Sequence, residues 1–554
     1  MATTAAVLTR SYDNARTGAN TAETVLTPDL VGRGLRKLFS VTVNDDPRLE
    51  AQPLIVPGLR MPDGKLHDVL YVCTMANQVW AFDANDGSQL WANPVSLGTP
   101  IRSNHSIDLW GINIAWGILS TPVIDVDTQT MYVVNWSSPD HRPINGTFAL
   151  HALNIVDGTH RHPPLPIQAS FQAGGLQATF KPNKQKQRSA LLLSPLAAAG
   201  GAKKTLFMAC GSTNESDASL HGWVLAFDPA TFTQTAAFCP APKNGIGGVW
   251  QAGQGPASDD QGNVYVITGN AAWDGQTDFG NSFLKLTYRP PNGAGAAGSL
   301  TLTDWWTPFR NQDRKPAFSD QDLGSGGPVI LPGMGIVLGA GKDGVLYVLD
   351  QNNLGKAVGT ANGFNKLKSP PIFFTYFPGP GRSPMGDLDF LFGNKTHHLH
   401  GAPVFWASPD LGPMLFNWGE NENLRAWNVD ATGKVKFLAK GLEVASAGAP
   451  GQGGMPGGML TLSANGATPH TGVVWAAAPI HGDANRHVVE GILRAYDATQ
   501  FVTNPDGSKT LKLLWDSKRL AGNRYNHCKF CPPVVWNGKV YMATYDGRVD
   551  VYGP

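Results

Sequence analysis

The sequence predicts an all-β protein that folds as a single eight-bladed β-propeller, with seven blades as the alternative count. A pattern of short apolar strands and turn residues returns eight times along the chain, at a spacing of roughly 40–75 residues. The composition is rich in turn residues, with 64 glycines and 41 prolines among 554 residues, whereas charged residues make up only 15%. No long segment has helical periodicity, so strands must supply the core.

The clearest copy of the pattern is the first. Its strands are AQPLIV (51–56), VLYVCTM (69–75) and QVWAFDANDGSQLW (78–91), with polar turns between them. The later copies occupy residues 120–158, 189–231, 253–288, 322–350, 400–438, 457–499 and 531–553. Each copy has three or four strands, which is the size of one propeller blade. Since one such sheet cannot bury both faces alone, the blades must stack face to face, with the 16 tryptophans and 24 phenylalanines as filler.

The two ends of the chain fit the closure of a ring. The last copy ends with its third strand, VDVYG, whereas an extra strand, LRKLFSVTV (35–43), precedes the first copy. We predict that this N-terminal strand completes the C-terminal blade as its outer strand, because an open ring would expose a sheet edge and two blade faces. Residues 1–34 are predicted to be an irregular N-terminal segment, and residues 35–554 the propeller.

Charge and hydropathy argue against two classes of partner. The 43 basic and 42 acidic residues balance, so no electrostatic footprint for nucleic acid is present. No stretch approaches the ~18 apolar residues that a membrane span needs. The five cysteines are too sparse for a disulfide framework. Cys528 and Cys531 have C-x-x-C spacing, for which packed thiols, a short disulfide and a metal half-site stay open.

Several segments carry more than fold information. GAGKDGVLYVLDQNNLGK (339–356) is preceded by Thr-Pro at 307–308 and by DQDLGSGGPV (320–329). YVITGNAAWDG (265–275) is a strand that ends in Thr-Gly-Asn before a Trp-containing loop, and STNESDASLHGWVLAFD (212–228) places an acidic loop before a strand. Together these segments resemble the eight-bladed quinoprotein dehydrogenases, the pyrroloquinoline-quinone alcohol dehydrogenases and their polyvinyl-alcohol-dehydrogenase-like relatives.

The resemblance implies an oxidoreductase that oxidises an alcohol, polyol or carbohydrate hydroxyl with pyrroloquinoline quinone and Ca²⁺. Asn270 matches the family's amide ligand to calcium, and Asp217 matches its carboxylate ligand, with Glu215 in that place if the loop is gapped. Asp322 matches the general base, and Lys342 matches the cation that hydrogen-bonds the quinone oxygens. These residue types suit the chemistry, because Ca²⁺ prefers hard oxygen ligands and a base must take the hydroxyl proton.

Other residues are candidates on chemical grounds. Trp250 precedes a Gly-rich blade entry and is expected either to stack on a planar cofactor or sugar or to fill the core. His397, His398 and His400 lie in KTHHLHG, where alternate residues of a strand share one face, so His398 and His400 are either a metal-binding pair or polar rim residues. His400 is the histidine we expect to act at the mouth of the ring.

Two polar clusters leave a functional and a structural interpretation open. Glu420 and Glu422 sit at a turn, where they are either acid–base carboxylates or a solvated loop. A second cluster lies between two predicted strands and consists of His481, Asp483, Asn485 and His487.

The chain departs from the family pattern at its cysteines. It has no adjacent cysteine pair, and CKFC (528–531) is followed by Pro532 instead of a haem-attachment histidine. We therefore expect a separate electron acceptor. Two alternatives stay open, a cofactor-free propeller acting as a polysaccharide lyase or hydrolase and a non-catalytic binding scaffold. The N-terminus lacks a signal-peptide pattern, so either the protein is cytoplasmic or its leader has been removed. The resemblance favours the second alternative, a periplasmic or secreted protein whose leader is absent from this chain.

Overall fold

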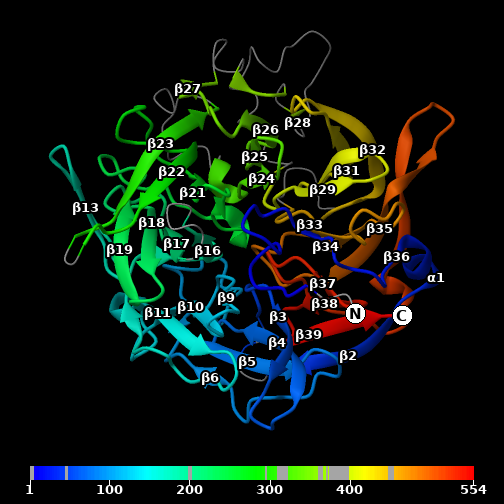
Figure 1. Cartoon of the computed structure of the whole chain (residues 1–554), viewed down its shortest axis with the longest axis horizontal. Helices are drawn as coiled ribbons and strands as arrows, with labels where there is room; N and C mark the ends of the chain where they lie inside the picture. The colour runs from blue at the N-terminus through cyan, green and yellow to red at the C-terminus, as the bar shows by residue number, and fades with distance from the viewer. Residues whose placement is uncertain are drawn as a thin grey trace.

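The structure confirms the predicted all-β propeller. It is a computed structural model that describes residues 5–43, 46, 48–196, 203–293, 296–308, 322–359, 366–369, 372–373, 398–446 and 454–554. Antiparallel sheets stand side by side in a ring, and the first strand of each sheet lies nearest the centre (Figure 1). Each copy of the repeated sequence pattern therefore corresponds to one set of antiparallel strands, and these sets are arranged around a common axis.

The described strands form four-stranded units in chain order. The first three units are β3 (Leu54–Arg60), β4 (Leu66–Cys73), β5 (Gln78–Asp83) and β6 (Val95–Ser96); β9 (Val123–Asp125), β10 (Thr130–Ser137), β11 (Thr147–Asn154) and β12 (Leu165–Pro166); and β16 (Leu192–Pro195), β17 (Lys204–Ser212), β18 (Trp223–Asp228) and β19 (Thr233–Phe238). The next three are β20 (Ala257–Ser258), β21 (Asn263–Ile267), β22 (Phe283–Arg289) and β23 (Ser299–Thr307); β24 (Val329–Leu331), β25 (Ile336–Ala340), β26 (Val345–Asp350) and β28 (Ile372–Phe373); and β29 (Val404–Ser408), β30 (Gly412–Asn417), β31 (Asn423–Val429) and β32 (Val435–Val444). The last two are β33 (Met459–Ser463), β34 (Val473–Pro479), β35 (Gly491–Thr503) and β36 (Lys509–Asp516); and β37 (Val534–Trp536), β38 (Lys539–Ala543), β39 (Arg548–Gly553) and β2 (Arg36–Thr42), in which β2 comes from the N-terminal part of the chain.

Smaller elements lie in the segments outside these four-stranded units. They are β1 (Ala19–Asn20), α1 (Pro28–Arg33), β7 (Ile101–Arg102), β8 (Ala115–Trp116), β13 (Ser170–Ala173), β14 (Leu176–Thr179), β15 (Gln185–Lys186), β27 (Ala357–Val358) and 3₁₀ turns at Pro143–Asn145, Gln251–Gly253, Leu323–Ser325 and Ser517–Arg519. One parallel pairing, Lys440 with Thr510, joins the units of β29–β32 and β33–β36 into a single nine-stranded sheet. The number of blades stays a prediction, because this sheet runs without a break through two units.

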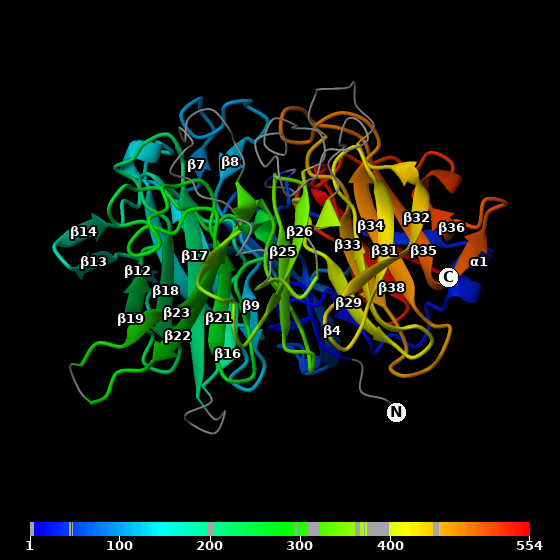
Figure 2. The same cartoon turned by 90° about the horizontal axis from the view of Figure 1, so that it is seen from above.

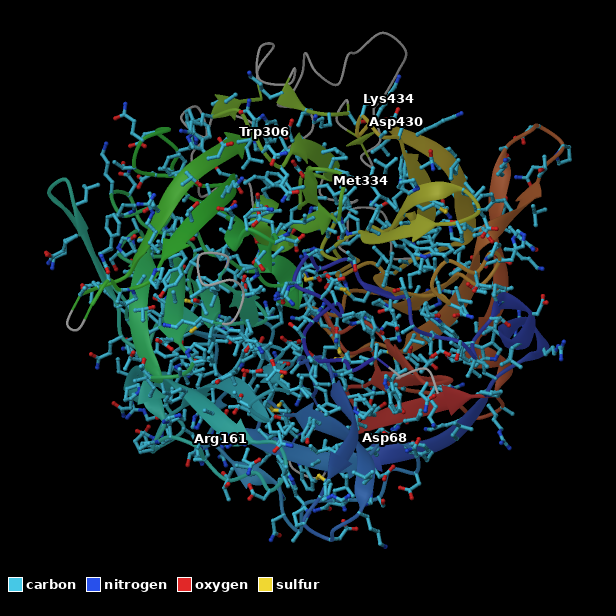
Figure 3. The ribbon with its side chains drawn as sticks, viewed as in Figure 1. Asp68, Arg161, Trp306, Met334, Asp430 and Lys434 are labelled. Carbon is cyan, nitrogen blue, oxygen red and sulfur yellow. The ribbon has the colours of Figure 1, made fainter. Side chains whose placement is uncertain are left out.

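Apolar side chains from facing units fill the spaces between the sheets (Figure 3). Trp136 of β10 and Trp223 of β18 are fully buried in one cluster between neighbouring units. Trp306, labelled in Figure 3, packs in the same way between β22 and β26, with its ring centroid 5.0 Å from that of Tyr347. Both faces of an inner strand such as β10 are therefore covered, which explains its nearly continuous apolar sequence.

The N-terminal strand closes the ring as predicted. Strand β2 pairs antiparallel with β39 from Arg36 opposite Gly553 to Thr42 opposite Arg548, and it forms the outer edge of that unit. The pairing ties the first part of the propeller to the last, so opening the ring would require breaking a full strand ladder.

Residues 7–20 follow the inside of the ring and bond to the first strand of one unit after another. The backbone pairs, with N···O distances of 2.8–2.9 Å, are Val7 with Ile55, Leu8 with Ile124, Asn14 with Ser258, Ala15 with Ile330, Thr17 with Phe405 and Gly18 with Leu462. Side chains reach two further units, from Asn14 to the Leu193 carbonyl and from Asn20 to the Val535 carbonyl. The segment predicted to be irregular thus connects units all around the ring.

Arg16 is the centre of this N-terminal segment. Its side chain is fully buried, and burial lowers the pKa of the guanidinium to about 9. The guanidinium donates to the carbonyls of Arg10, Leu191 and Pro256 and to the hydroxyl of Thr9, at 2.7–3.0 Å. A planar donor fork can satisfy several carbonyls at once, which a shorter polar side chain cannot do.

The two faces of the ring differ. In Figure 2, β7 and β8 stand at one face of the ring, at the top of the view. Among the described residues, no helix has the length and apolar character that crossing a bilayer requires.

Candidate functional site

A cavity of about 610 Å³ opens beside β7 and β8 and collects side chains from distant parts of the chain. This volume is in the range of small-molecule sites. Among the residues singled out from the sequence, Glu215, Trp250, Asp322, Lys342 and His400 line it. These residues lie next to strands of more than one unit, so the propeller fold is what brings them together.

One wall consists of Trp250 and its neighbours. The indole packs against Gly211 and Gly248, where an added Cβ would lie only 2.6 Å from indole atoms. Its Nε1 donates to the Glu215 carboxylate, and the Asn270 amide lies 3.4 Å from Oε2 of the same carboxylate. The two glycines let the indole lie close to the backbone, and the remaining contacts place a carboxylate and an amide beside the ring.

Asp217 has a different environment from Glu215. Its carboxylate accepts a hydrogen bond from the backbone N–H of Ser219 at 3.0 Å, and side-chain and backbone bonds from Ser219 lower its pKa. Asp217 does not line the cavity, whereas Glu215 does. The structure therefore brings Glu215 next to Asn270, which is the pairing that a gapped loop implies.

Asp322 and Lys342 form a buried ion pair at the cavity. The Lys342 Nζ lies 3.7 Å from Oδ2 of Asp322, and their side chains are 11% and 7% exposed. The other carboxylate oxygen packs against Gly269, where an added Cβ would lie 2.1 Å from Oδ1. Gly269 is the middle residue of the Thr-Gly-Asn motif, so this glycine leaves room for the Asp322 carboxylate.

His400 lines the cavity and pairs with a second buried carboxylate, that of Glu420. Its Nε2 is 2.8 Å from Oε1 of Glu420, and His398 Nδ1 is 3.7 Å from Oε2. Burial raises the pKa of Glu420 to about 7. The Glu420 side chain is only 1% exposed. Glu422 is more exposed, and its carboxylate pairs with Arg425 at 2.8 Å. His397 lies outside the described residues.

Four cationic side chains that line the cavity were not predicted from the sequence, namely Lys184, Lys186, Arg188 and Lys529. Lys186 is held by the Ile107 carbonyl at 2.7 Å and lies 4.0 Å from the centre of the Trp116 ring. Arg188 pairs with Glu50 at 3.0 Å, and Lys529 donates to Asn485 at 2.8 Å. Lys186 and Arg188 are two residues apart on an extended segment, and residues at this spacing share one face. This spacing could have indicated from the sequence that the two cations lie together.

Burial lowers the pKa of two of these cations. The pKa of Lys186 falls to about 7, through burial first and then the nearby charges of Arg188 and Lys529. The pKa of Lys529 falls to about 8 for the same main reason. A cluster of cations that is hard to keep charged in isolation is an arrangement that an anionic ligand would stabilise.

The remaining candidates lie partly at the cavity and partly away from it. Asn485 lines the cavity, whereas His481 and His487 are exposed. Cys528 and Cys531 are free, buried thiols, and burial raises the pKa of Cys528 well above its usual range.

The cavity residues fit a flat, multiply charged anion together with a hard cation. Trp250 offers a planar surface, and Lys186, Arg188 and Lys529 offer positive charge. Glu215 offers carboxylate oxygens, and Asn270, whose Nδ2 donates to Glu215, carries an amide oxygen of the kind that Ca²⁺ also prefers. Pyrroloquinoline quinone, a planar tricyclic tricarboxylate, has the shape and charge that this donor set would accept.

Solved structures of similar fold cover this chain almost completely. Quinohemoprotein alcohol dehydrogenase from Comamonas testosteroni matches with a TM-score of 0.55 at 15% identity, over 99% of this chain and 80% of its own. Quinohemoprotein alcohol dehydrogenase ADHIIG from Pseudomonas putida HK5 matches with a TM-score of 0.50 at 12% identity, over 99% and 80% of the two chains. A europium-containing methanol dehydrogenase matches with a TM-score of 0.53 at 12% identity, over 99% and 98%.

These matches confirm the predicted resemblance to quinoprotein dehydrogenases as a likeness of fold. No family model matches the chain, and no curated protein matches it in sequence.

Proposed function

We propose that this protein is a quinoprotein-type oxidoreductase that oxidises the hydroxyl group of an alcohol, polyol or carbohydrate. The observation that carries the proposal is that one cavity gathers Glu215 and Trp250 with the Asp322–Lys342 pair, although Glu215 follows β17 and the ion pair belongs to the unit of β24–β28. A fold shared with alcohol and methanol dehydrogenases supports the same class of reaction. The comparisons give the polysaccharide lyase alternative no support.

Each residue has a role that follows from its contacts. Asp322 accepts the proton of the substrate hydroxyl at its carboxylate, and Lys342, 3.7 Å away, orients that carboxylate and supplies positive charge beside the reacting oxygen. Trp250 would provide the surface on which the cofactor stacks, and Glu215 and Asn270 would hold Ca²⁺. When bound, the quinone supplies the two-electron oxidant and Ca²⁺ supplies a Lewis acid.

The proposal includes a location and an electron partner. We further propose that the reduced protein passes its electrons to a separate acceptor. We place this activity in the periplasm or outside the cell.

Dye reduction tests the proposed activity. The protein is incubated with pyrroloquinoline quinone and Ca²⁺, desalted, and mixed with an artificial electron acceptor and a panel of alcohols, polyols and sugars. We expect substrate-dependent bleaching of the dye that requires both the quinone and Ca²⁺. Dye that stays coloured with every hydroxylated compound, despite retained quinone, would rule the proposed reaction out.

The affinity for the quinone should fall as the pH rises from about 6.5 to about 8.5. Lysine is charged below its pKa, and the pKa values of Lys186 and Lys529 are about 7 and about 8, so both lose their charge in this interval. Losing charge-assisted contacts to the carboxylates should weaken binding about tenfold. Equilibrium titrations at each pH measure the effect.

The variant that carries both Lys186→Gln and Lys529→Gln is the control for this pH dependence. It should bind the quinone weakly and with little change over the same interval. A wild-type affinity that stays constant or rises with pH would show that these lysines do not contact the anion.

A further inference from the structure

His398, His400 and Glu420 converge beside the cavity described above. One ligand atom from each of the three residues lies within 4.8 Å of the others. The distances are 2.8 Å from His400 Nε2 to Glu420 Oε1 and 3.7 Å from His398 Nδ1 to Glu420 Oε2. Ligands of a tetrahedral zinc ion lie about 2.0–2.2 Å from the metal, and so about 3.4 Å from one another. The three side chains are therefore already close to the spacing of a metal site.

The backbone holds these side chains in place through bonds to neighbouring segments. The N–H of Leu399, between the two histidines, donates to the Gly341 carbonyl, and its own carbonyl accepts from the Ser325 hydroxyl, both at 3.0 Å. The N–H of Glu420 donates to the His398 carbonyl at 2.9 Å. Such cross-bracing keeps the ligands oriented before any metal arrives.

Burial makes this set unlike an exposed acidic cluster. The side chains of His400 and Glu420 are 2% and 1% exposed, and that of His398 is 13% exposed. A buried carboxylate is costly unless positive charge or hydrogen bonds compensate it. Gly454 donates to Glu420 at 3.3 Å, and a divalent cation between the carboxylate and the two imidazoles would supply the charge.

We propose that His398, His400 and Glu420 form a site for a divalent transition-metal ion of the zinc type, separate from the calcium position at Glu215 and Asn270. Two imidazoles and one carboxylate suit zinc and its neighbours, whereas calcium takes oxygen ligands. Three protein ligands leave a coordination position for water or for an oxygen of a bound molecule, and His400 lines the cavity on that side. The proposal does not depend on quinone binding.

Metal titration of the protein alone tests this site. The protein is purified without a histidine tag, treated with a chelator, dialysed without quinone or Ca²⁺, and titrated with Zn²⁺ by calorimetry. We expect one Zn²⁺ per chain, and we expect the affinity to fall about 100-fold or more in His400→Gln and in Glu420→Gln. His470→Gln is the matched control, because His470 also pairs with a carboxylate, Asp410 at 3.2 Å, but is 65% exposed and lies outside the cavity lining.

The spectrum of the wild-type protein with Co²⁺ gives a second readout that does not rely on a variant folding. The proposed ligands predict visible d–d bands without a thiolate charge-transfer band. A strong thiolate band would place the metal at Cys528 and Cys531 instead and overturn the proposal. So would the lack of stoichiometric Zn²⁺ binding, or an affinity that is equal in wild type, His400→Gln and Glu420→Gln.

Discussion

Replacing Asp322 with asparagine should lower the turnover of alcohol oxidation by about 100- to 10,000-fold, the usual contribution of a general base. Asparagine keeps the shape that fits against Gly269, but its amide cannot take the hydroxyl proton. The loss should fall on kcat, with the amount of bound quinone unchanged. Dye-coupled kinetics on quinone-loaded protein measure it.

Asp217→Asn is the matched control for this prediction. It makes the same chemical change at a carboxylate that does not line the cavity, so its kcat should stay close to that of the wild type. Asp322→Asn protein that retains turnover within tenfold of wild type would remove Asp322 from the role of base. An equal loss in Asp217→Asn would show that the effect is not specific to the cavity.

Replacing Arg16 with alanine should lower the free energy of unfolding by about 3 kcal/mol or more. The change leaves the carbonyls of Arg10, Leu191 and Pro256 buried without their donor, and each such loss costs about 1–3 kcal/mol. The effect extends beyond one unit, because residues 7–20 bond to first strands around the ring. Guanidinium unfolding followed by tryptophan fluorescence measures the change.

Arg33→Ala is the control for the stability prediction. Arg33 is an exposed residue of helix α1, and such surface changes usually stay within about 0.5 kcal/mol. Arg16→Lys should recover only part of the loss, because an ammonium group cannot match the guanidinium fork. Arg16→Ala protein that unfolds at the wild-type denaturant concentration would contradict the role given to this residue.

The fold could be predicted from the sequence because its signals are local. Turn residues mark the ends of each strand, and alternating apolar residues identify the buried faces. Both patterns can be recognised in the sequence without knowledge of distant contacts. The closure of the ring by residues 35–43 followed from counting strands at the two ends. The path of residues 7–20 could not be predicted in this way, because these residues bond one at a time to strands that lie up to several hundred residues away.

Part of the candidate site could be predicted from motifs, and Trp250 and His400 could be predicted from the chemistry of their side chains. Asp322, Lys342 and Asn270 stand in segments that resemble quinoprotein sequences, and the structure brings them to the region of one cavity. The choice between Asp217 and Glu215 depends on the course of a loop, which spacing alone does not settle. Glu420 lies next to His398 and His400 because the antiparallel strands β29 and β30 return the chain to the same end of the sheet. The carboxylate partner of the histidines therefore became apparent only in the structure.

The central claim is that this cavity holds pyrroloquinoline quinone, and binding of the quinone tests it most directly. Purified protein is mixed with excess quinone and Ca²⁺, desalted, and the quinone retained per chain is read from its absorbance. We predict one quinone per chain for the wild type and a large loss in Trp250→Ala, with Trp110→Ala, a change at an exposed tryptophan on the cavity rim, retaining most of it. Quinone that elutes free from the wild-type protein at every pH, or that stays bound equally well without Trp250, would contradict the claim.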